Sequence, residues 1–300
     1  MSSIGAMFLN LNKPCYSPGT QVEGMIALNL MAPLLQGSRI NISIRGLEEN
    51  LLIHAYTVRV SDGEGGTREE TKYKELTAKQ NILSYDFVVF NNASGSFMPG
   101  QYSFPFSFTL KSGIPSSFNS RFKMHERDAY AKVNYTLSAT LMIAGGGKPI
   151  LSASREFFVN QVRTGEVGAR SNITKTKVSS FCCLSKGEVS FAAHIEKPEY
   201  TAGENAYMIA EVDNSQCKAD IKAIRGILKQ TITLRAQGET GTYEETVRSQ
   251  EVEGMVAGDV KKAQNSIRFK LPMSNINGGP FQPSCQGALI KSEYILLVEL

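Results

Sequence analysis

The sequence predicts an all-β protein built from two tandem β-sandwiches. In several short segments, apolar side chains recur at every second position, which is the pattern of strands with one buried face. Gly, Pro, Asn and Ser separate these segments at intervals typical of a sandwich. Several short motifs of the first half recur in the same order in the second half. The length of 300 residues also exceeds the ~250 residues that one hydrophobic core usually reaches.

The first clear element is a turn at residues 13–19, followed by a strand at residues 21–30. Pro14 fixes φ before Tyr16, and Gly19 frees the backbone for a tight bend. Residues of one parity in the strand face the same side of a sheet; they are Val22, Gly24, Ile26, Leu28 and Leu30. Burial of each aliphatic side chain stabilises the fold by roughly 1.5–3 kcal/mol, so a few of them can hold two sheets together.

Further strands follow from the same alternation. Residues 102–110 and 133–141 both place large apolar side chains at every second position. The glycines at 145–147 supply a turn before another strand at residues 150–159. Helical periodicity is weak throughout the chain. Residues 71–82 fit either a short helix or an edge strand, and both alternatives stay open.

The motifs of the first half return at an offset that only decreases along the chain. The matched segments are 13–19 with 197–203, 44–46 with 224–226, 63–67 with 238–242, and 135–141 with 294–300. Each match alone could arise by chance. Together and in one order, they indicate a duplicated domain with deletions in its second copy.

The two copies divide the chain into three parts. We predict a first domain at residues 1–163, a basic linker or hinge at 164–180 and a second domain at 181–300. The second copy stops at the counterpart of residue 141, so we expect it to lack the last strand of the first copy. Either the polypeptide continues or a partner supplies that strand.

Composition indicates a soluble globular protein. The chain has 42% hydrophobic residues, and 32 Lys and Arg against 28 Asp and Glu give a net charge of +4. This small excess does not predict a nucleic-acid partner, because phosphate binding needs basic residues gathered on one face. Residues 1–11 lack the features of a signal peptide, and no apolar run approaches 18 residues. We therefore expect the protein in the cytoplasm.

The motifs resemble those of a known family. The first half contains Tyr-x-Pro-Gly-x-x-Val-x-Gly at 16–24, Ile-x-Ile-x-Gly-x-Glu at 42–48, Pro-Gly-x-Tyr-x-Phe-Pro-Phe-x-Phe-x-Leu at 99–110 and Ile-Pro-Ser-Ser-Phe at 114–118. The second half contains Cys-Cys at 182–183, Tyr-x-x-Gly-Glu at 200–204, Val-x-Asn-x-x-Cys at 212–217 and Pro-Ser-Cys-x-Gly at 283–287. Together they resemble the two arrestin domains, and are closer to the arrestin-domain-containing proteins, or alpha-arrestins, than to visual and beta-arrestins.

This resemblance implies two immunoglobulin-like β-sandwiches joined by a hinge. It also implies a non-enzymatic adaptor that binds membrane-protein cargo tails and trafficking or ubiquitination machinery, peripheral to the endosomal or plasma membrane. Sheet edges and the loop at residues 61–70 would supply the contacts. Alpha-arrestins usually recruit ubiquitin ligases through Pro-Pro-x-Tyr, which this sequence lacks. A structural subunit of a stable assembly, such as a retromer-like coat or a cytoskeletal or ciliary complex, therefore stays open as an alternative.

We expect no catalytic, metal-binding or cofactor-binding site. His54, His125 and His194 lie far apart without the paired spacing of metal ligands. No Gly-rich loop precedes a helix in the way that phosphate binding requires. Cys285 follows Ser284 in a motif of the resembled family, and we interpret it as a structural thiol.

The remaining candidates are thiols and cations. Five scattered cysteines are typical of reduced thiols rather than of a disulfide framework. Cys182 and Cys183 follow the basic stretch that contains Arg170, Lys175 and Lys177, which suits S-acylation beside an anionic membrane. Structural thiols are the alternative for this pair.

Two further cations are candidates by the resemblance alone. Arrestins sense phosphorylated receptor tails with basic residues on the first strand, which makes Lys13 and Arg45 candidate contacts for a phosphate or an acidic peptide. This sequence has a single Lys where the phosphate-sensing arrestins have an adjacent pair. A solvated surface charge is the alternative for both residues.

Overall fold

The computed structural model describes residues 4–61, 63, 66–92, 95–143, 147–161, 172–180, 184–197, 199–274 and 281–300. Strands make up nearly all of the regular structure of these residues, which also contain one 3₁₀ turn, η1 (Ala263–Asn265). The prediction of an all-β fold is confirmed. Residues 71–82, which fitted a helix or a strand, lie within a strand.

The chain forms two compact units, neither of which is continuous in sequence. Unit 1 contains residues 1–162 together with two later segments, 233–242 and 283–291. Unit 2 contains residues 163–232, 243–282 and 292–300. The domains that we predicted are continuous ranges of residues, and their boundaries stay predictions.

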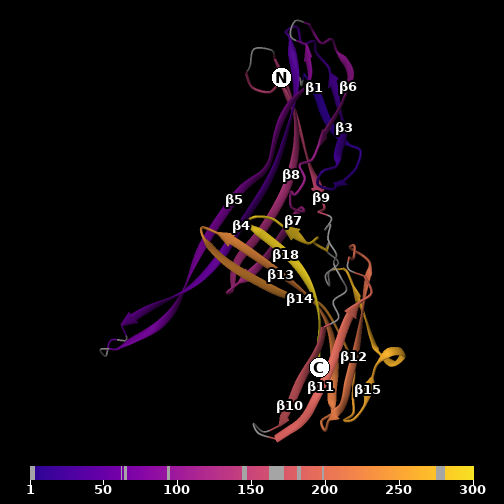
Figure 1. Ribbon diagram of the computed structural model, residues 1–300. Helices are drawn as coiled ribbons and strands as arrows, with labels where there is room; N and C mark the ends of the chain where they lie inside the picture. Colours follow the sequence, from indigo (N-terminus) through magenta and orange to yellow (C-terminus); the bar gives the residue numbers. More distant parts are fainter. Residues whose placement is uncertain are drawn as a thin grey trace. The chain divides into compact units, whose positions relative to one another are not determined.

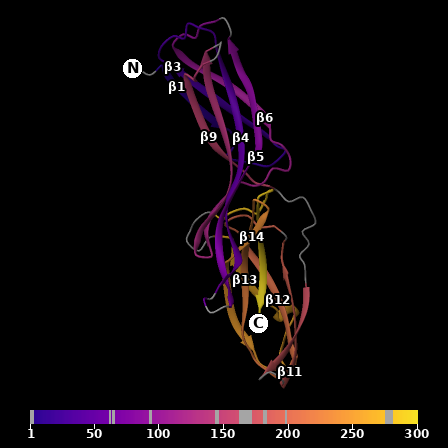
Figure 2. The ribbon, with the colours of Figure 1, turned by 90° about the vertical axis from the view of Figure 1, so that its left-hand side faces the viewer.

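Unit 1 has two sheets. The first has the strand order β1 (Gly5–Leu11), β3 (Gln21–Leu30) and β6 (Gly100–Thr109). The second has the order β2 (Cys15–Tyr16), β9 (Leu151–Val159), β8 (Arg127–Ile143), β4 (Ser38–Ser61) and β5 (Thr67–Asn92), and β7 (Phe118–Met124) also pairs with β8. Figures 1 and 2 show these strands as two layers of a sandwich.

Alternating burial along the strands of unit 1 places one face of each sheet in a common core. The rings of Phe90 on β5 and Phe104 on β6 lie 4.8 Å apart, which joins the two sheets. In β4, Ile40, Ile42 and Ile44 are fully buried on one parity. Their β-branched side chains suit a pleated surface, and their burial accounts for the stability of the central strand.

Unit 2 is built mainly from two further sheets. One has the order β10 (Asn172–Ser180), β11 (Leu184–Ile195), β12 (Asn205–Cys217) and β15 (Val260–Lys261), and β16 (Ile267–Pro272) also pairs with β12. The other has the order β14 (Glu239–Met255), β13 (Ile221–Ala236), β18 (Ile290–Glu299) and β17 (Cys285–Gln286). All of β17 and short parts of β13, β14 and β18 belong to unit 1.

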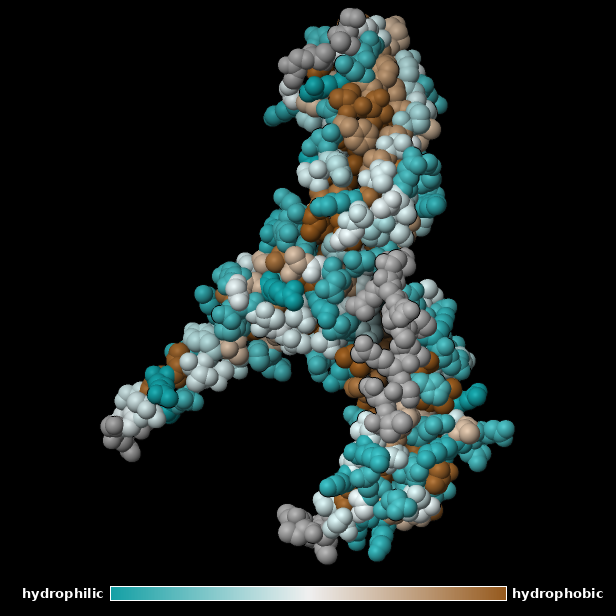
Figure 3. Space-filling model, in the orientation of Figure 1, coloured by the Kyte–Doolittle hydropathy of each residue, from teal (hydrophilic) through white to brown (hydrophobic). Residues whose placement is uncertain are grey.

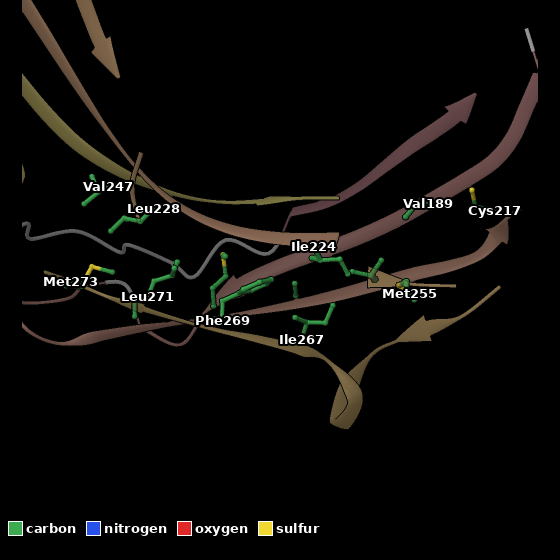
Figure 4. Packing of buried hydrophobic residues seen from close by; sticks show 14 residues of the cluster. Val189, Cys217, Ile224, Leu228, Val247, Met255, Ile267, Phe269, Leu271 and Met273 are labelled. Atoms are coloured by element: carbon green, nitrogen blue, oxygen red, sulfur yellow. The ribbon is translucent and has the colours of Figure 1, made fainter. Parts of the chain in front are cut away.

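The core of unit 2 gathers apolar side chains from several strands (Figure 4). Met208 on β12, Phe269 on β16 and Ile224 on β13 are almost fully buried within it. A β-carbon added at Gly226 on β13 would lie 2.7 Å from the Phe269 ring. Glycine at this position therefore allows the two sheets to approach closely.

The repeated sequence motifs adopt the same local structure in both copies. The backbone N–H of Lys13 donates to the Tyr16 hydroxyl at 3.2 Å, and the N–H of Lys197 donates to the Tyr200 hydroxyl at 3.4 Å. Gly19 and Gly203 both have positive φ, 80° and 90°. These conformations close the predicted turns and support the duplication.

The strands that follow are also equivalent. β4 lies between β5 and β8, as β13 lies between β14 and β18. Arg45 on β4 pairs with Asp86 on β5, and Arg225 on β13 pairs with Glu251 on β14, both at 2.8 Å. The second sandwich thus repeats the exposed ion pair of the first.

Residues 172–180, which we assigned to the linker, instead form strand β10 and pair with β11. The physical reason is an alternation that the basic composition obscured. Thr174, Thr176 and Val178 are β-branched, which favours a strand, and they alternate with Lys175 and Lys177; residues 174–177 are exposed on both faces of this strand.

A buried carboxylate fastens a late segment of the chain to the first sandwich. Glu48 on β4 is fully buried and accepts hydrogen bonds from the backbone N–H groups of Ala288, Leu289 and Ile290, at 3.2, 3.0 and 2.8 Å. A side chain at Gly287 would collide with the same carboxylate. The motif that ends in Glu48 therefore positions the segment 283–291 within unit 1.

Neighbouring polar groups complete this attachment. The Asn50 amide donates to the carbonyl oxygens of Arg235 and Leu289, at 3.0 and 3.2 Å. Burial raises the pKa of Glu48, although the three backbone amides and the Arg235 charge oppose the shift. Burial also raises the pKa of the Cys285 thiol to about 12, in agreement with a structural role for this cysteine.

Gly226→Ala should lower the free energy of unfolding by about 1–3 kcal/mol, because its methyl group would overpack the core against Phe269. Denaturant titration would measure the change. Lys222→Ala, at an exposed position on the same strand, is the control and should change stability by less than about 0.5 kcal/mol. Equal stabilities for the two variants would contradict the close approach of the sheets.

Glu48→Gln should change how stability depends on pH. The pKa of Glu48 is raised in the folded state, so as pH rises above the ordinary value of 4.5 the unfolded chain ionises first. The wild type should therefore lose stability relative to the Gln variant until the pH exceeds the folded pKa. Unfolding free energies measured from pH 4 to 8 would test this, and parallel curves for the two proteins would count against it.

Candidate protein-interaction site

Strands β4 and β5 continue beyond the sheet as a two-stranded ribbon. β4 pairs with β8 only from Ser38 to Leu51, whereas it pairs with β5 as far as Ser61 and Thr67. We call residues 52–61 and 67–76 the projecting arm. Figure 1 shows it extending away from the rest of unit 1, at the lower left. Within the loop that we predicted at residues 61–70, Ser61 belongs to β4 and residues 67–70 belong to β5.

The base of the arm is fixed by packing. Leu52, Ile53 and Leu76 are buried there. The turn between β13 and β14, which belongs to unit 1, lies against them: Gly241 leaves no room for a side chain next to Leu52, and Gln237 donates to the Thr77 carbonyl at 3.3 Å. The base is therefore a rigid support for the exposed part.

One face of the arm combines apolar and basic side chains. His54 and Tyr56 stack at a centroid distance of 6.3 Å, and Tyr56 is 40% exposed. Side chains directly opposite one another on this face pair as His54 with Lys74, Tyr56 with Lys72, Val58 with Glu70 and Val60 with Arg68. Lys74, Lys72 and Arg68 lie beside this short apolar column with the acid Glu70, and a second acid, Glu239, lies 3.6 Å from His54. This face is chemically suited to an extended acidic peptide that also presents apolar side chains.

The opposite face is more fully paired within the protein. The guanidinium of Arg127 lies 5.4 Å from the centre of the Tyr73 ring, and the His125 ring lies 5.1 Å from it. Arg59 and Glu69 form an exposed ion pair at 3.6 Å. Because its charges are balanced and its aromatic ring is already in contact, this face is the weaker candidate for binding.

The outer edge of the arm offers backbone hydrogen bonds. β5 is the last strand in its sheet, so one row of its N–H and C=O groups lacks a strand partner in the part of the chain that the structure describes. Lys, Arg and Glu residues along β5 protect such an edge from nonspecific pairing. An added strand from another protein could nevertheless pair with it, and the side chains of the arm would then select its sequence.

The cations that we predicted as anion contacts lie apart from this arm. Lys13 is exposed in the turn before β2. Arg45 already donates two hydrogen bonds of 2.8 Å to Asp86. The hydrogen bond from Ser43 and this pairing with Arg45 lower the pKa of Asp86. The role of Lys13 and Arg45 toward phosphate stays a prediction.

The predicted membrane-facing cations are only partly described. Lys175 and Lys177 are exposed on β10 of unit 2, and Lys175 lies 3.6 Å from Glu188. Arg170, Cys182 and Cys183 lie outside the described residues, so their predicted roles stay predictions. The described residues contain no group of three or more His, Cys, Asp or Glu side chains that could hold a metal ion. None of their helices is long and apolar enough to cross a membrane.

The projecting arm was not predicted from the sequence. Its signal was present, because Tyr56, Val58 and Val60 alternate with small or polar residues. The pairing partner at residues 67–76 carries so many charges that a helix remained equally acceptable for part of it. The structure resolves this ambiguity, because residues 67–76 pair as a strand with residues 52–61.

Comparisons with known proteins agree with this architecture. The model of the arrestin (or S-antigen) N-terminal domain matches residues 6–163, and that of the C-terminal domain matches residues 185–300. Arrestin domain-containing protein A of Dictyostelium discoideum is 25% identical over 98% of this chain and 48% of its own length. Arrestin domain-containing protein 4 of Mus musculus is 26% identical over 82% of this chain and 57% of its own length. The chain thus spans about half the length of these relatives.

The paired sheets, the duplicated turns and the two matching domain models lead to one conclusion. The chain belongs to the arrestin family, as an arrestin-domain-containing protein with both the amino-terminal and the carboxy-terminal domain.

Proposed function

We propose that the chain acts as a non-enzymatic adaptor that binds cytosolic segments of membrane-protein cargo and connects them to trafficking or ubiquitination machinery. The observation that carries the proposal is the projecting arm, which presents an exposed apolar and basic face on a rigid base. Membership of the arrestin family supports an adaptor role in trafficking. The names of the relatives identify them as arrestin-domain proteins and name no cargo.

The chemistry of the arm specifies the kind of cargo segment. An extended peptide would pair with the backbone edge of β5 and direct alternate side chains toward the face that contains Tyr56. Acidic or phosphorylated residues in the peptide would meet Lys72, Lys74 and Arg68. An unfolded cytosolic tail of a membrane protein provides such a segment without having to unfold first.

The double variant Tyr56→Ala, Lys72→Ala tests the arm, since these residues are cross-strand neighbours on its candidate face. Loss of an aromatic contact and a cation should reduce the recovery of membrane-protein partners by about tenfold or more. Tagged protein would be cross-linked in cells, and the integral membrane proteins bound to it would be quantified by mass spectrometry.

The matched control is Tyr207→Ala, Lys270→Ala, the same cross-strand pair on β12 and β16 of unit 2, where Tyr207 is 37% exposed. It should leave recovery unchanged. Stoichiometric co-purification of the wild type with one soluble assembly, without membrane proteins, would instead support the structural-subunit alternative and overturn the adaptor proposal.

A further inference from the structure

One end of unit 1 displays three large apolar side chains in its loops. The loops at residues 31–37, 95–99 and 147–150 lie at this end, since Leu30 pairs with Gly100 and Ser38 pairs with both Asn92 and Ile143. Met31, Leu35 and Met98 are 65%, 77% and 58% exposed. We call these three residues the apolar end. Figure 3 shows hydrophobic residues gathered near the upper end of unit 1, over β1, β3 and β6.

The outward direction of two of these side chains follows from a hydrogen-bonded bridge. Leu34 and Phe97 exchange backbone N–H to C=O bonds of 2.8 and 2.9 Å, and both side chains are buried. The Phe97 ring also packs 4.9 Å from the ring of Tyr102. Because side chains alternate along extended backbone, burial of Leu34 and Phe97 directs Leu35 and Met98 toward solvent.

Further hydrogen bonds fix the backbone at the exposed residues. The N–H of Met31 donates to the Ile4 carbonyl at 2.9 Å, and the Tyr102 hydroxyl donates to the Met98 carbonyl at 2.8 Å. The three apolar side chains are thus presented on an ordered frame. A binding partner would not have to supply the free energy for ordering these loops.

The charge around the apolar end has one sign. Sequence segments 1–22, 24–47, 87–125 and 129–155, which include every loop at this end, contain no Asp or Glu. The loops and the strand ends beside them carry the cations Arg39 and Lys148. The end is therefore both apolar and electropositive, and an anionic partner would meet no like charge.

We propose that the apolar end docks onto an anionic lipid bilayer. Met31, Leu35 and Met98 enter the boundary between headgroups and acyl chains, while the exposed Lys148 and the half-buried Arg39 attract the lipid headgroups. A fluid bilayer accepts apolar side chains from separate loops without a complementary pocket. The proposal does not depend on cargo binding, because the projecting arm lies at the far end of β4.

The chain contains no Trp, so Leu35→Trp provides a fluorescent probe at this position alone. With vesicles of phosphatidylcholine and phosphatidylserine, its emission should shift to shorter wavelength, and brominated lipids should quench it. The control Val256→Trp, at a 65% exposed position in unit 2, should show neither change. An unshifted and unquenched Leu35→Trp probe would overturn the proposal.

Sedimentation with the same vesicles tests the affinity. The triple variant Met31→Ser, Leu35→Ser, Met98→Ser should bind at least about tenfold more weakly than the wild type. The control replaces three exposed apolar residues of unit 2: Val256→Ser, Val260→Ser, Ile295→Ser. Binding of this control variant to the vesicles should equal that of the wild type. Thermal unfolding would verify that both variants fold. Equal binding of the wild type and the first triple variant would refute the apolar contribution.

Charge is tested separately. Lys148→Glu places an acid at the end of unit 1 and should weaken binding to the anionic vesicles, and the loss should diminish as salt rises. Vesicles of phosphatidylcholine alone should bind the wild type weakly. Equal binding to neutral and anionic vesicles would overturn the assignment to an anionic surface.

Discussion

Hydrogen bonds from three consecutive backbone N–H groups to one buried carboxylate attach a late segment of the chain to the first compact unit. The Glu48 carboxylate satisfies the N–H groups of residues 288–290, and these groups in turn offset part of the cost of burying its charge. Removal of either partner would leave a buried polar group without hydrogen bonds. Unit 1 therefore includes a segment that lies about 240 positions later in the sequence.

This attachment also supports the surface that we propose for cargo. Arg235 connects the Glu48 region to the hairpin of β13 and β14, since its N–H donates to the Leu289 carbonyl and its guanidinium donates to the Ala288 carbonyl. The turn of the same hairpin packs against Leu52 at the base of the projecting arm. The arm can remain exposed and ordered because its base is buried by distant parts of the chain. At the other end of β4, the apolar end is ordered by local hydrogen bonds instead.

Local patterns predicted the strands and the duplication because their signals lie within a few residues. The turns at Tyr16 and Tyr200 and the equivalence of residues 44–46 with 224–226 could be matched from sequence motifs alone, whereas the acidic partners of Arg45 and Arg225 could not. The backbone groups that donate to Glu48 could not be predicted from the sequence, because no periodicity links residue 48 to residues 288–290. In the same way, Met31, Leu35 and Met98 come to the same end of unit 1 only once β3 has paired with β6 and β4 has paired with β5. For β10 and the arm, dense charge obscured an alternation that was present.

The discontinuity of unit 1 has a consequence for how the protein is made. During synthesis the amino-terminal sandwich emerges first, but its carboxylate at Glu48 waits for residues 288–290 before it acquires its hydrogen bonds. Until then the base of the arm also lacks the turn that covers Leu52. The nascent chain therefore exposes the apolar surface around Leu52 until residues 233–242 and 283–291 have been made. Chaperones that shield extended, apolar segments would meet their substrate in this interval, before β17 and β18 leave the ribosome.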